Sequence, residues 1–262
     1  MGSAAFFDLD KTIIARASVL AFAGPLYEAQ LLTRRHLTRS AYAQFAFATG
    51  RADHTQMEKM RTYLSAMVAG WNTTTLRRVV KAHLAQIVSP LVYAEAVELI
   101  RQHQLADRDV IIVTSTGADL AEPIGALLGV DHVLSTRMVE RDDSYTGEIA
   151  DYMYGERKAE AIRELAAERG YDLEASYAYS DSGTDQPMLA VVGHPHAVNP
   201  DRDLRRIAAA SSWPILEFRR APVFNPGRDR SQLIMTFLAV GLVGVAIAFW
   251  MGRRRGIEET TG

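Results

Sequence analysis

Three short apolar runs constrain the fold of this chain, because each one ends in acidic or hydroxyl side chains. The runs are Ser3–Leu9, Asp109–Thr114 and Ala175–Ser180. A short and almost wholly apolar run is typical of a strand buried on both faces of a parallel sheet. Longer segments with helical spacing separate the three runs. This alternation predicts an α/β fold with a doubly wound parallel sheet.

The remaining elements follow from periodicity and from glycine and proline positions. Residues 13–89 show helical spacing with little strand character, which predicts an all-helical insertion after the first strand. Helices are also predicted over 90–104, 118–128 and 156–169, and strands over 133–139, 145–149, 188–192 and 196–198. The strand at 145–149 is expected to form a hairpin after an acidic turn, and the last two strands are expected to close the sheet.

Composition limits the partners and the metal chemistry. The chain has 262 residues, is 48% hydrophobic and has a formal net charge of -2, so nothing in its charge balance points to nucleic acid. It contains no cysteine, which excludes disulfides and cysteine-ligated zinc. Any metal would therefore be bound by oxygen or histidine ligands.

The C-terminal region contains a predicted membrane span. Leu233 to Met251 is nearly all apolar and, at ~1.5 Å per residue, would reach about the thickness of one hydrocarbon core. Trp250 lies at one end, as interfacial aromatic residues do, and Gly244 and Ala248 form a small-xxx-small pair that could support a homodimer. We therefore expect a linker over 219–230, a transmembrane helix over 231–252 and a tail over 253–262.

The expected location follows from the two ends of the chain. The N-terminal residues have neither a basic region nor an apolar region of signal-peptide length. A single-pass C-terminal anchor in the cell membrane, with the catalytic domain in the cytoplasm, is therefore the predicted arrangement.

Four groups of polar residues carry the candidate chemistry. They are Asp8-x-Asp10-x-Thr12, then Thr114 with Ser115, then Lys158, and finally Asp181 with Asp185. Each group lies at a predicted strand end or near a helix start. In open α/β sheets the carboxyl ends of the strands meet at one edge, where ligands bind. Carboxylate oxygens there suit Mg²⁺, which prefers oxygen ligands.

These motifs, in this order, resemble the haloacid dehalogenase (HAD) superfamily, subfamily IB, in its phosphoserine-phosphatase-like branch. The resemblance covers roughly residues 4–218, and the segment from Tyr179 to Asp185 with Pro187-Met188-Leu189 is very similar to the last motif of that branch. It implies a Rossmann-like core over 1–14 and 89–218, a helical cap over 15–88, and Mg²⁺-dependent phosphatase activity.

The resemblance also implies a role for each site residue. Asp8 would attack phosphorus and form an aspartyl-phosphate, while Asp10 would transfer protons. The metal would be bound by Asp8, Asp181 and the backbone carbonyl of Asp10. The phosphoryl oxygens would be bound by Thr114, Ser115 and Lys158, with Thr12 in support. Asp185 would orient Lys158 or the metal-bound waters.

Three other readings of the same residues remain. Asp10-Lys11-Thr12 is similar to the phosphorylated motif of P-type ion pumps, but those continue with glycine, and position 13 here is Ile. A phosphotransferase would use the same aspartyl-phosphate and pass the group to another alcohol. A membrane-tethered binding module without activity is disfavoured by the intact acids, Thr114 and Lys158.

One position bears on the substrate. Phosphoserine phosphatases resemble each other in a glutamate nine residues after the nucleophile, where this chain has Ala17. This difference argues against phosphoserine. With the predicted anchor, it favours a lipid or other membrane-associated phosphomonoester over a free amino-acid phosphate, although a small-molecule phosphomonoester also fits the motifs.

Overall fold

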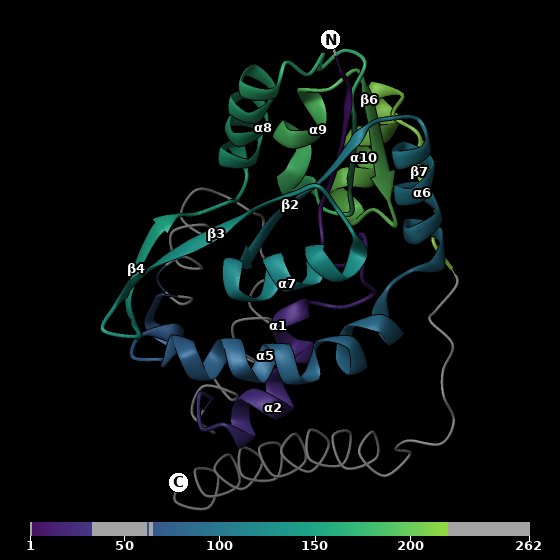
Figure 1. Ribbon diagram of the computed structural model, residues 1–262. Helices are drawn as coiled ribbons and strands as arrows, with labels where there is room; N and C mark the ends of the chain where they lie inside the picture. Colours follow the sequence, from purple (N-terminus) through teal and green to yellow (C-terminus); the bar gives the residue numbers. More distant parts are fainter. Residues whose placement is uncertain (1, 33–61, 63–64, 220–262) are drawn as a thin grey trace, which may run out of the picture. The chain divides into compact units, whose positions relative to one another are not determined.

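The computed structural model describes residues 2–32, 62 and 65–219 of the chain. The described part is built on a sheet of seven strands in the order β4-β3-β2-β1-β5-β6-β7 (Figure 1). The strands are β1 (Ala4–Phe7), β2 (Asp109–Gly117), β3 (His132–Arg141), β4 (Ser144–Asp151), β5 (Tyr177–Ser180), β6 (His194–Val198) and β7 (Ile215–Leu216). All neighbours pair in parallel except β3 and β4, which form an antiparallel hairpin. The predicted doubly wound parallel sheet is confirmed.

The side chains of β1 and β2 alternate between two apolar cores. Phe7 and Ile112 belong to one core, and Phe6 and Ile111 belong to the other. Because both faces of these strands are buried, their sequences are continuous apolar runs.

Helices cover the two faces of the sheet. The helices α5 (Thr73–Val88), α6 (Ala94–Leu105) and α7 (Ala118–Leu128) contribute to the first core. The second core is built with α8 (Glu156–Arg169), α9 (Gln186–Ala190) and α10 (Arg202–Ser211). The predicted helices over 118–128 and 156–169 are confirmed, and both end at glycines, Gly129 and Gly170, in the left-handed conformation.

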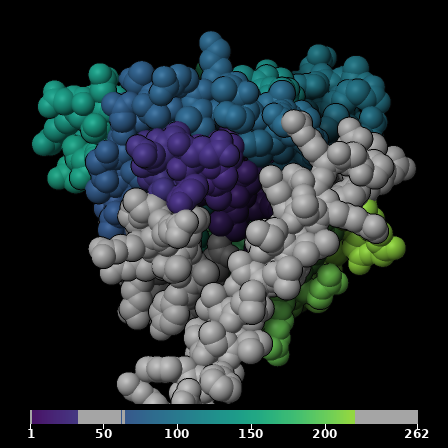
Figure 2. Space-filling model, turned by 90° about the horizontal axis from the view of Figure 1, so that it is seen from below, coloured from purple at the N-terminus to yellow at the C-terminus, as the bar shows by residue number. Residues whose placement is uncertain are grey.

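The segment expected to form the cap is helical where it is described. It contains α1 (Ser18–Ala21), α2 (Ala23–Glu28) and α5, and a 3₁₀ turn (Ser89–Leu91) leads into α6. Figure 2 shows the purple α1–α2 segment beside α5, with the hairpin near one end of that helix. A large part of the predicted cap, residues 33–61 and 63–64, lies outside the described residues, so its boundaries at 15 and 88 stay a prediction.

One predicted strand is wrong. The apolar segment at 188–192 does not join the sheet; it overlaps α9, in which Met188 and Leu189 are buried. Pro187 in the first turn favours a helix start, and a short apolar run cannot be assigned to strand or helix by periodicity alone. The predicted strand over 196–198 is confirmed as part of β6. The short strand β7 beyond it and the helix α10 were not predicted.

Within residues 2–32, 62 and 65–219, no helix is long and apolar enough to cross a membrane. The predicted span at 233–251, with its tail and nearly all of its linker, lies outside these residues.

Candidate active site

The site lies at the carboxyl end of β1, at the point where the order of the strands reverses. Asp8 directly follows β1, and its backbone N–H donates to the carbonyl oxygen of Tyr179 in β5 at 2.9 Å. The next strand in sequence, β2, lies on one side of β1, and β5 lies on the other. Such a switch point opens a crevice outside the strand ends, where α/β sheets bind their ligands.

Lys158 lies between two carboxylates, Asp8 and Asp185. It is the third residue of α8, and its Nζ donates to Asp8 Oδ1 at 2.7 Å and to Asp185 Oδ2 at 2.8 Å. The lysine is only 2% exposed. Burial by itself would lower its pKa, but the two carboxylates together raise the pKa above its ordinary value. Lys158 is therefore a fixed positive charge beside Asp8.

The acids around Lys158 outnumber the positive charge. Burial raises the pKa of Asp8 well above its ordinary value, and Asp185 and Asp181 raise it further, against the effect of Lys158. Burial also raises the pKa of Asp181 to about 7. This crowding of carboxylates in a buried site favours an additional cation.

Asp10 is held by the segments that follow it and by the end of β2. Its Oδ1 accepts from the backbone N–H of Ser18 at 2.8 Å, and its Oδ2 accepts from Thr116 Oγ1 at 3.1 Å. Burial raises the pKa of Asp10, while these hydrogen bonds lower it. A carboxyl group with a raised pKa, fixed by two donors, is suited to proton transfer.

The end of β2 has an irregular register against β3 between Thr114 and Gly117 and leads directly into α7. Thr114 is buried, and its Oγ1 accepts from the backbone N–H of Thr116 at 3.1 Å. Gly117 is the residue before the helix and provides no side-chain cap, so the first backbone N–H groups of α7 are not capped by a side chain. Ser115, beside Thr114, is half-buried. The junction of β2 and α7 has hydroxyl groups and uncapped N–H groups, which are donors of the kind that a phosphoryl group requires.

The loop after β5 holds the remaining acids. Ser180 Oγ donates to Asp185 Oδ2 at 2.7 Å, so this oxygen accepts from both Ser180 and Lys158. The backbone N–H of Gly183 donates to Asp201 Oδ2 at 3.1 Å, and the N–H of Asp201 donates to the carbonyl oxygen of Asp181 at 2.8 Å. Asp201 also caps α10, so that helix fixes the loop carrying Asp181.

Thr12 is fully buried. Its hydroxyl oxygen has no hydrogen-bond partner among the described residues. Thr12 follows the two acids in the sequence, but no contact of its hydroxyl among the described residues assigns it a role in the site.

The residues at the site fit Mg²⁺ if side-chain carboxylates and a backbone carbonyl bind it together. Within the described part of the chain, no group of three or more histidine or acidic side chains is arranged to hold a metal ion. The carboxylates of Asp8 and Asp181 and the backbone carbonyl of Asp10 would bind the metal. Its remaining coordination positions would be open to water and to a phosphoryl oxygen. All of these donors are oxygens, and Mg²⁺ commonly keeps several waters.

Four polar residues with direct contacts to the acids were not assigned a role from the sequence: Ser18, Thr116, Ser180 and Asp201. The signals for three of them were present. Ser180 directly precedes Asp181, Thr116 belongs to the run of hydroxyl residues at the end of β2, and Asp201 precedes a segment with helical spacing, as a helix cap does. Ser18 contacts Asp10 through its backbone N–H and also through its side chain, and no sequence signal pointed to either contact.

Known families and proteins resemble this chain over most of its length. The haloacid dehalogenase-like hydrolase family matches residues 5–190. An inhibition of morphological differentiation protein from Streptomyces azureus is 52% identical, over 97% of this chain and 94% of that protein. A probable phosphatase from Mycobacterium tuberculosis is also 52% identical, over 93% of this chain and 86% of its own length.

A solved structure shows the same fold. The crystal structure of a phosphoserine phosphatase in its apo form has a TM-score of 0.61 and covers 84% of this chain and 95% of its own chain, at 17% identity. At this identity the match concerns the fold alone.

Proposed function

Because the chain belongs to the haloacid dehalogenase-like hydrolase family and is a phosphoric monoester hydrolase, we propose that it acts through an aspartyl-phosphate on Asp8. The observation that carries this proposal is the 2.7 Å contact between Lys158 Nζ and Asp8 Oδ1 at the switch point of the sheet. An ammonium ion there favours the ionised, nucleophilic form of the carboxylate and lowers its repulsion of an anionic substrate.

The proposed reaction has two steps. First, an oxygen of Asp8 forms a bond to phosphorus, the ester P–O bond breaks, and Asp10 gives a proton to the leaving alkoxide. Second, Asp10 takes a proton from a water molecule, whose oxygen bonds to phosphorus. The bond between Asp8 and phosphorus then breaks, and inorganic phosphate leaves. The raised pKa of Asp10 favours the protonated form that the first step needs.

The other residues bind and orient the reacting groups. Thr114, Ser115 and the backbone N–H groups at the start of α7 would bind phosphoryl oxygens, as helix starts do. Lys158 would neutralise negative charge on Asp8 and on the phosphate, and Asp185 would hold Lys158 in place at 2.8 Å.

We also propose Mg²⁺ as the metal, bound by Asp8, Asp181 and the backbone carbonyl of Asp10. When bound, it supplies positive charge that stabilises the phosphoryl oxygens. Support comes from the all-oxygen donors and from the excess of buried carboxylates over positive charges. Activity that survives a chelator, or that Mg²⁺ does not restore, would exclude this metal.

The substrate we propose is a phosphomonoester other than phosphoserine, with a lipid-borne or membrane-associated ester as the leading class. Ala17, the residue before α1, is half-buried and carries no charge for a substrate amine. A panel of phosphomonoesters tests this class. Faster turnover of soluble sugar phosphates or phosphoserine than of lysophospholipid phosphates would exclude it.

The predicted span at 233–251 supports a single-pass anchor in the cell membrane, with the catalytic domain on the cytoplasmic side and a homodimer through Gly244 and Ala248. Membrane fractionation of the full chain beside a chain ending at residue 230 tests the anchor. Protease accessibility in sealed vesicles tests the side of the membrane, and the dimer is tested by crosslinking Gly244→Leu beside the natural chain.

The decisive experiment compares the natural chain with Asp8→Asn in the hydrolysis of an aryl phosphate, with Mg²⁺ and in detergent. A matched control is Asp142→Asn, an exposed turn residue with a φ of +48°, a conformation that asparagine tolerates. We expect Asp8→Asn to abolish hydrolysis and Asp142→Asn to leave it unchanged. Equal rates for all three proteins would exclude Asp8 as the nucleophile.

The same assay distinguishes a phosphotransferase from a phosphatase. With an acceptor alcohol present, a transferase forms a new phosphomonoester that phosphorus NMR detects, whereas a phosphatase releases inorganic phosphate alone. An inactive binding module would give neither product.

A further inference from the structure

A side-chain network joins α5, the β3–β4 hairpin and the first turn of α7. Arg77 of α5 donates through Nε to Asp119 Oδ1 at 2.7 Å and through Nη2 to Glu140 Oε2 at 2.6 Å. The hydroxyl of Tyr145 in β4 donates to Asp119 Oδ2. Both oxygens of Asp119 therefore have a donor, one from the predicted cap and one from the hairpin.

The backbone fixes Tyr145 to the segment that leads into α5. The N–H of Gly70 donates to the carbonyl oxygen of Tyr145 at 2.8 Å, and the N–H of Tyr145 donates to the carbonyl oxygen of Trp71 at 3.0 Å. The N–H of Thr73 donates to the carbonyl oxygen of Asp143 at 2.9 Å. The start of α5 and the hairpin are thus hydrogen-bonded together, on the side where the figures place the hairpin beside α5 (Figures 1 and 2).

Asp119 lies in the helical turn whose N–H groups are proposed to bind phosphate. It is the second residue of α7, two positions after the end of β2, whose residues from Thr114 to Gly117 would bind the phosphoryl group with the first N–H groups of the helix. A free carboxylate in a first helical turn can turn back and accept from the N–H groups of its own helix. It would then compete with phosphate for the same donors and repel it electrostatically.

We infer that Arg77 and Tyr145 are positioning residues that hold the Asp119 carboxylate away from the phosphate-binding N–H groups and neutralise its charge. This inference rests on the proposed function, since it concerns how the same site binds phosphate. It makes α5 and the hairpin part of the phosphate-binding apparatus, although neither element carries a residue that contacts the phosphoryl group in the proposed reaction.

The test measures phosphate binding in Arg77→Gln. Freeing Asp119 from its positive partner should weaken the affinity for inorganic phosphate, measured by titration calorimetry with Mg²⁺, by about tenfold. KM for an aryl phosphate should rise by a similar factor, with a smaller change in kcat. The melting temperature should change little, because the Arg77 side chain is 52% exposed and exposed ion pairs add little stability.

The double variant Arg77→Gln with Asp119→Asn separates charge from simple structural support. An asparagine has no charge to repel phosphate, so the double variant should recover affinity to within about threefold of the natural chain. If the network acted only as a structural brace, removing a second member would leave affinity as low as in Arg77→Gln or lower.

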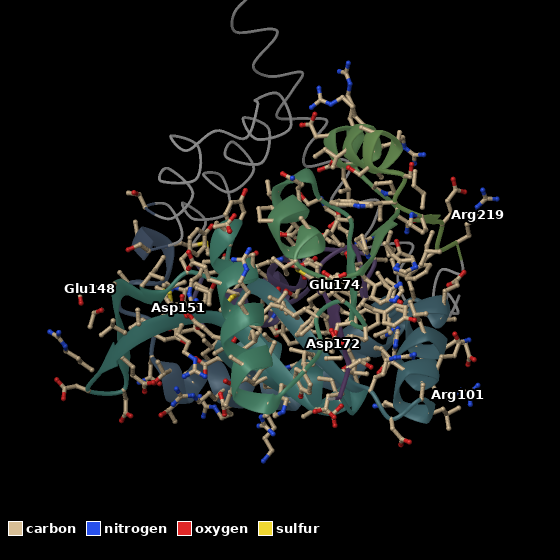
Figure 3. The ribbon with its side chains drawn as sticks, turned by 90° about the horizontal axis from the view of Figure 1, so that it is seen from above. Arg101, Glu148, Asp151, Asp172, Glu174 and Arg219 are labelled. Carbon is tan, nitrogen blue, oxygen red and sulfur yellow. The ribbon has the colours of Figure 1, made fainter. Side chains whose placement is uncertain are left out.

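Arg101→Gln is the matched control. Arg101 lies on α6 in an exposed pair with Glu98 at 2.8 Å. It is on the opposite side of the described body from the hairpin residues Glu148 and Asp151 (Figure 3). This variant should bind phosphate as the natural chain does.

Failure of the inference about Arg77 can be told apart from failure of the proposed function. A natural chain that binds phosphate but hydrolyses no ester contradicts the proposed function, and the binding comparison still tests Arg77. If Arg77→Gln binds phosphate like Arg101→Gln, or if the double variant does not recover, the inference is wrong.

Discussion

Replacing Lys158 by methionine is the most informative perturbation of the site. The side chain is 2% exposed, and its ammonium lies 2.7 Å from Asp8 and 2.8 Å from Asp185. Methionine preserves most of the apolar volume and removes only the charge and the donors. The variant therefore isolates the electrostatic contribution of the lysine.

The expected cost in stability follows from burial. Removing one partner of a buried ion pair leaves an uncompensated charge and costs about 3–5 kcal/mol, which for a domain of this size lowers the melting temperature by about 10 °C. Here two carboxylates lose the same partner, so part of the cost is relieved when one of them takes up a proton.

The expected cost in activity is larger. Loss of a preorganised charge beside the reacting group lowers kcat by about 10³-fold. The pH profile should also change in a defined direction. Lys158 lowers the pKa of Asp8, so without the lysine this pKa rises. Since attack needs the ionised carboxylate, the acidic limb of kcat/KM should move to higher pH.

The assay is aryl phosphate hydrolysis across pH, together with thermal unfolding of each protein. Lys158→Arg retains the charge and should keep more activity than Lys158→Met. Lys81→Met changes an exposed lysine of α5 and should behave as the natural chain does. If Lys158→Met kept kcat within about tenfold and an unchanged acidic limb, the electrostatic role derived from these distances would be refuted.

Two further predictions concern stability outside the site. Burial lowers the pKa of His103 to about 4 from an ordinary value of 6.5, so the folded state binds fewer protons than the unfolded state between these values. Stability should therefore fall by about 3 kcal/mol as the pH drops through this window, measured by denaturant unfolding, and His103→Gln should lack this component. Gly193→Ala should lower stability by about 3 kcal/mol or more, because a Cβ there would lie 1.9 Å from the carbonyl oxygen of Glu174. Gly24→Ala in α2, where a Cβ meets nothing within 4 Å, should instead be neutral or slightly stabilising, and equal melting temperatures for both alanine variants would contradict this reasoning.

Much of the fold was predictable because the local signals agreed with one another. The helix at 156–169 was predicted to the residue, since it has helical spacing and ends at Gly170. Where signals were short, prediction failed. The run at 188–192 is apolar enough for a strand, and Pro187 together with packing in the same core as α8 favours the helix α9 instead.

The sequence predicted which residues belong to the candidate site better than it predicted the hydrogen bonds between them. The structure brings Asp8, Lys158 and Asp185 together, as the motifs suggested. The donors to Asp10, however, are a backbone N–H and a hydroxyl from two different segments. No local sequence pattern predicts such contacts, because they depend on how the segment around Ser18 and the end of β2 pack against each other.

The sequence alone determined which residue types stand at the ends of apolar strands, because a buried strand that ends in acids and hydroxyls is a local pattern. It also determined where the helices around Lys158 and Asp119 begin. Only the tertiary structure decided which of these charges are paired. Lys158 reaches Asp8 across 150 positions of sequence, and Arg77 reaches Asp119 across 42. Such pairs depend on the register of parallel strands and on the packing of helices on their faces, which sequence spacing does not encode.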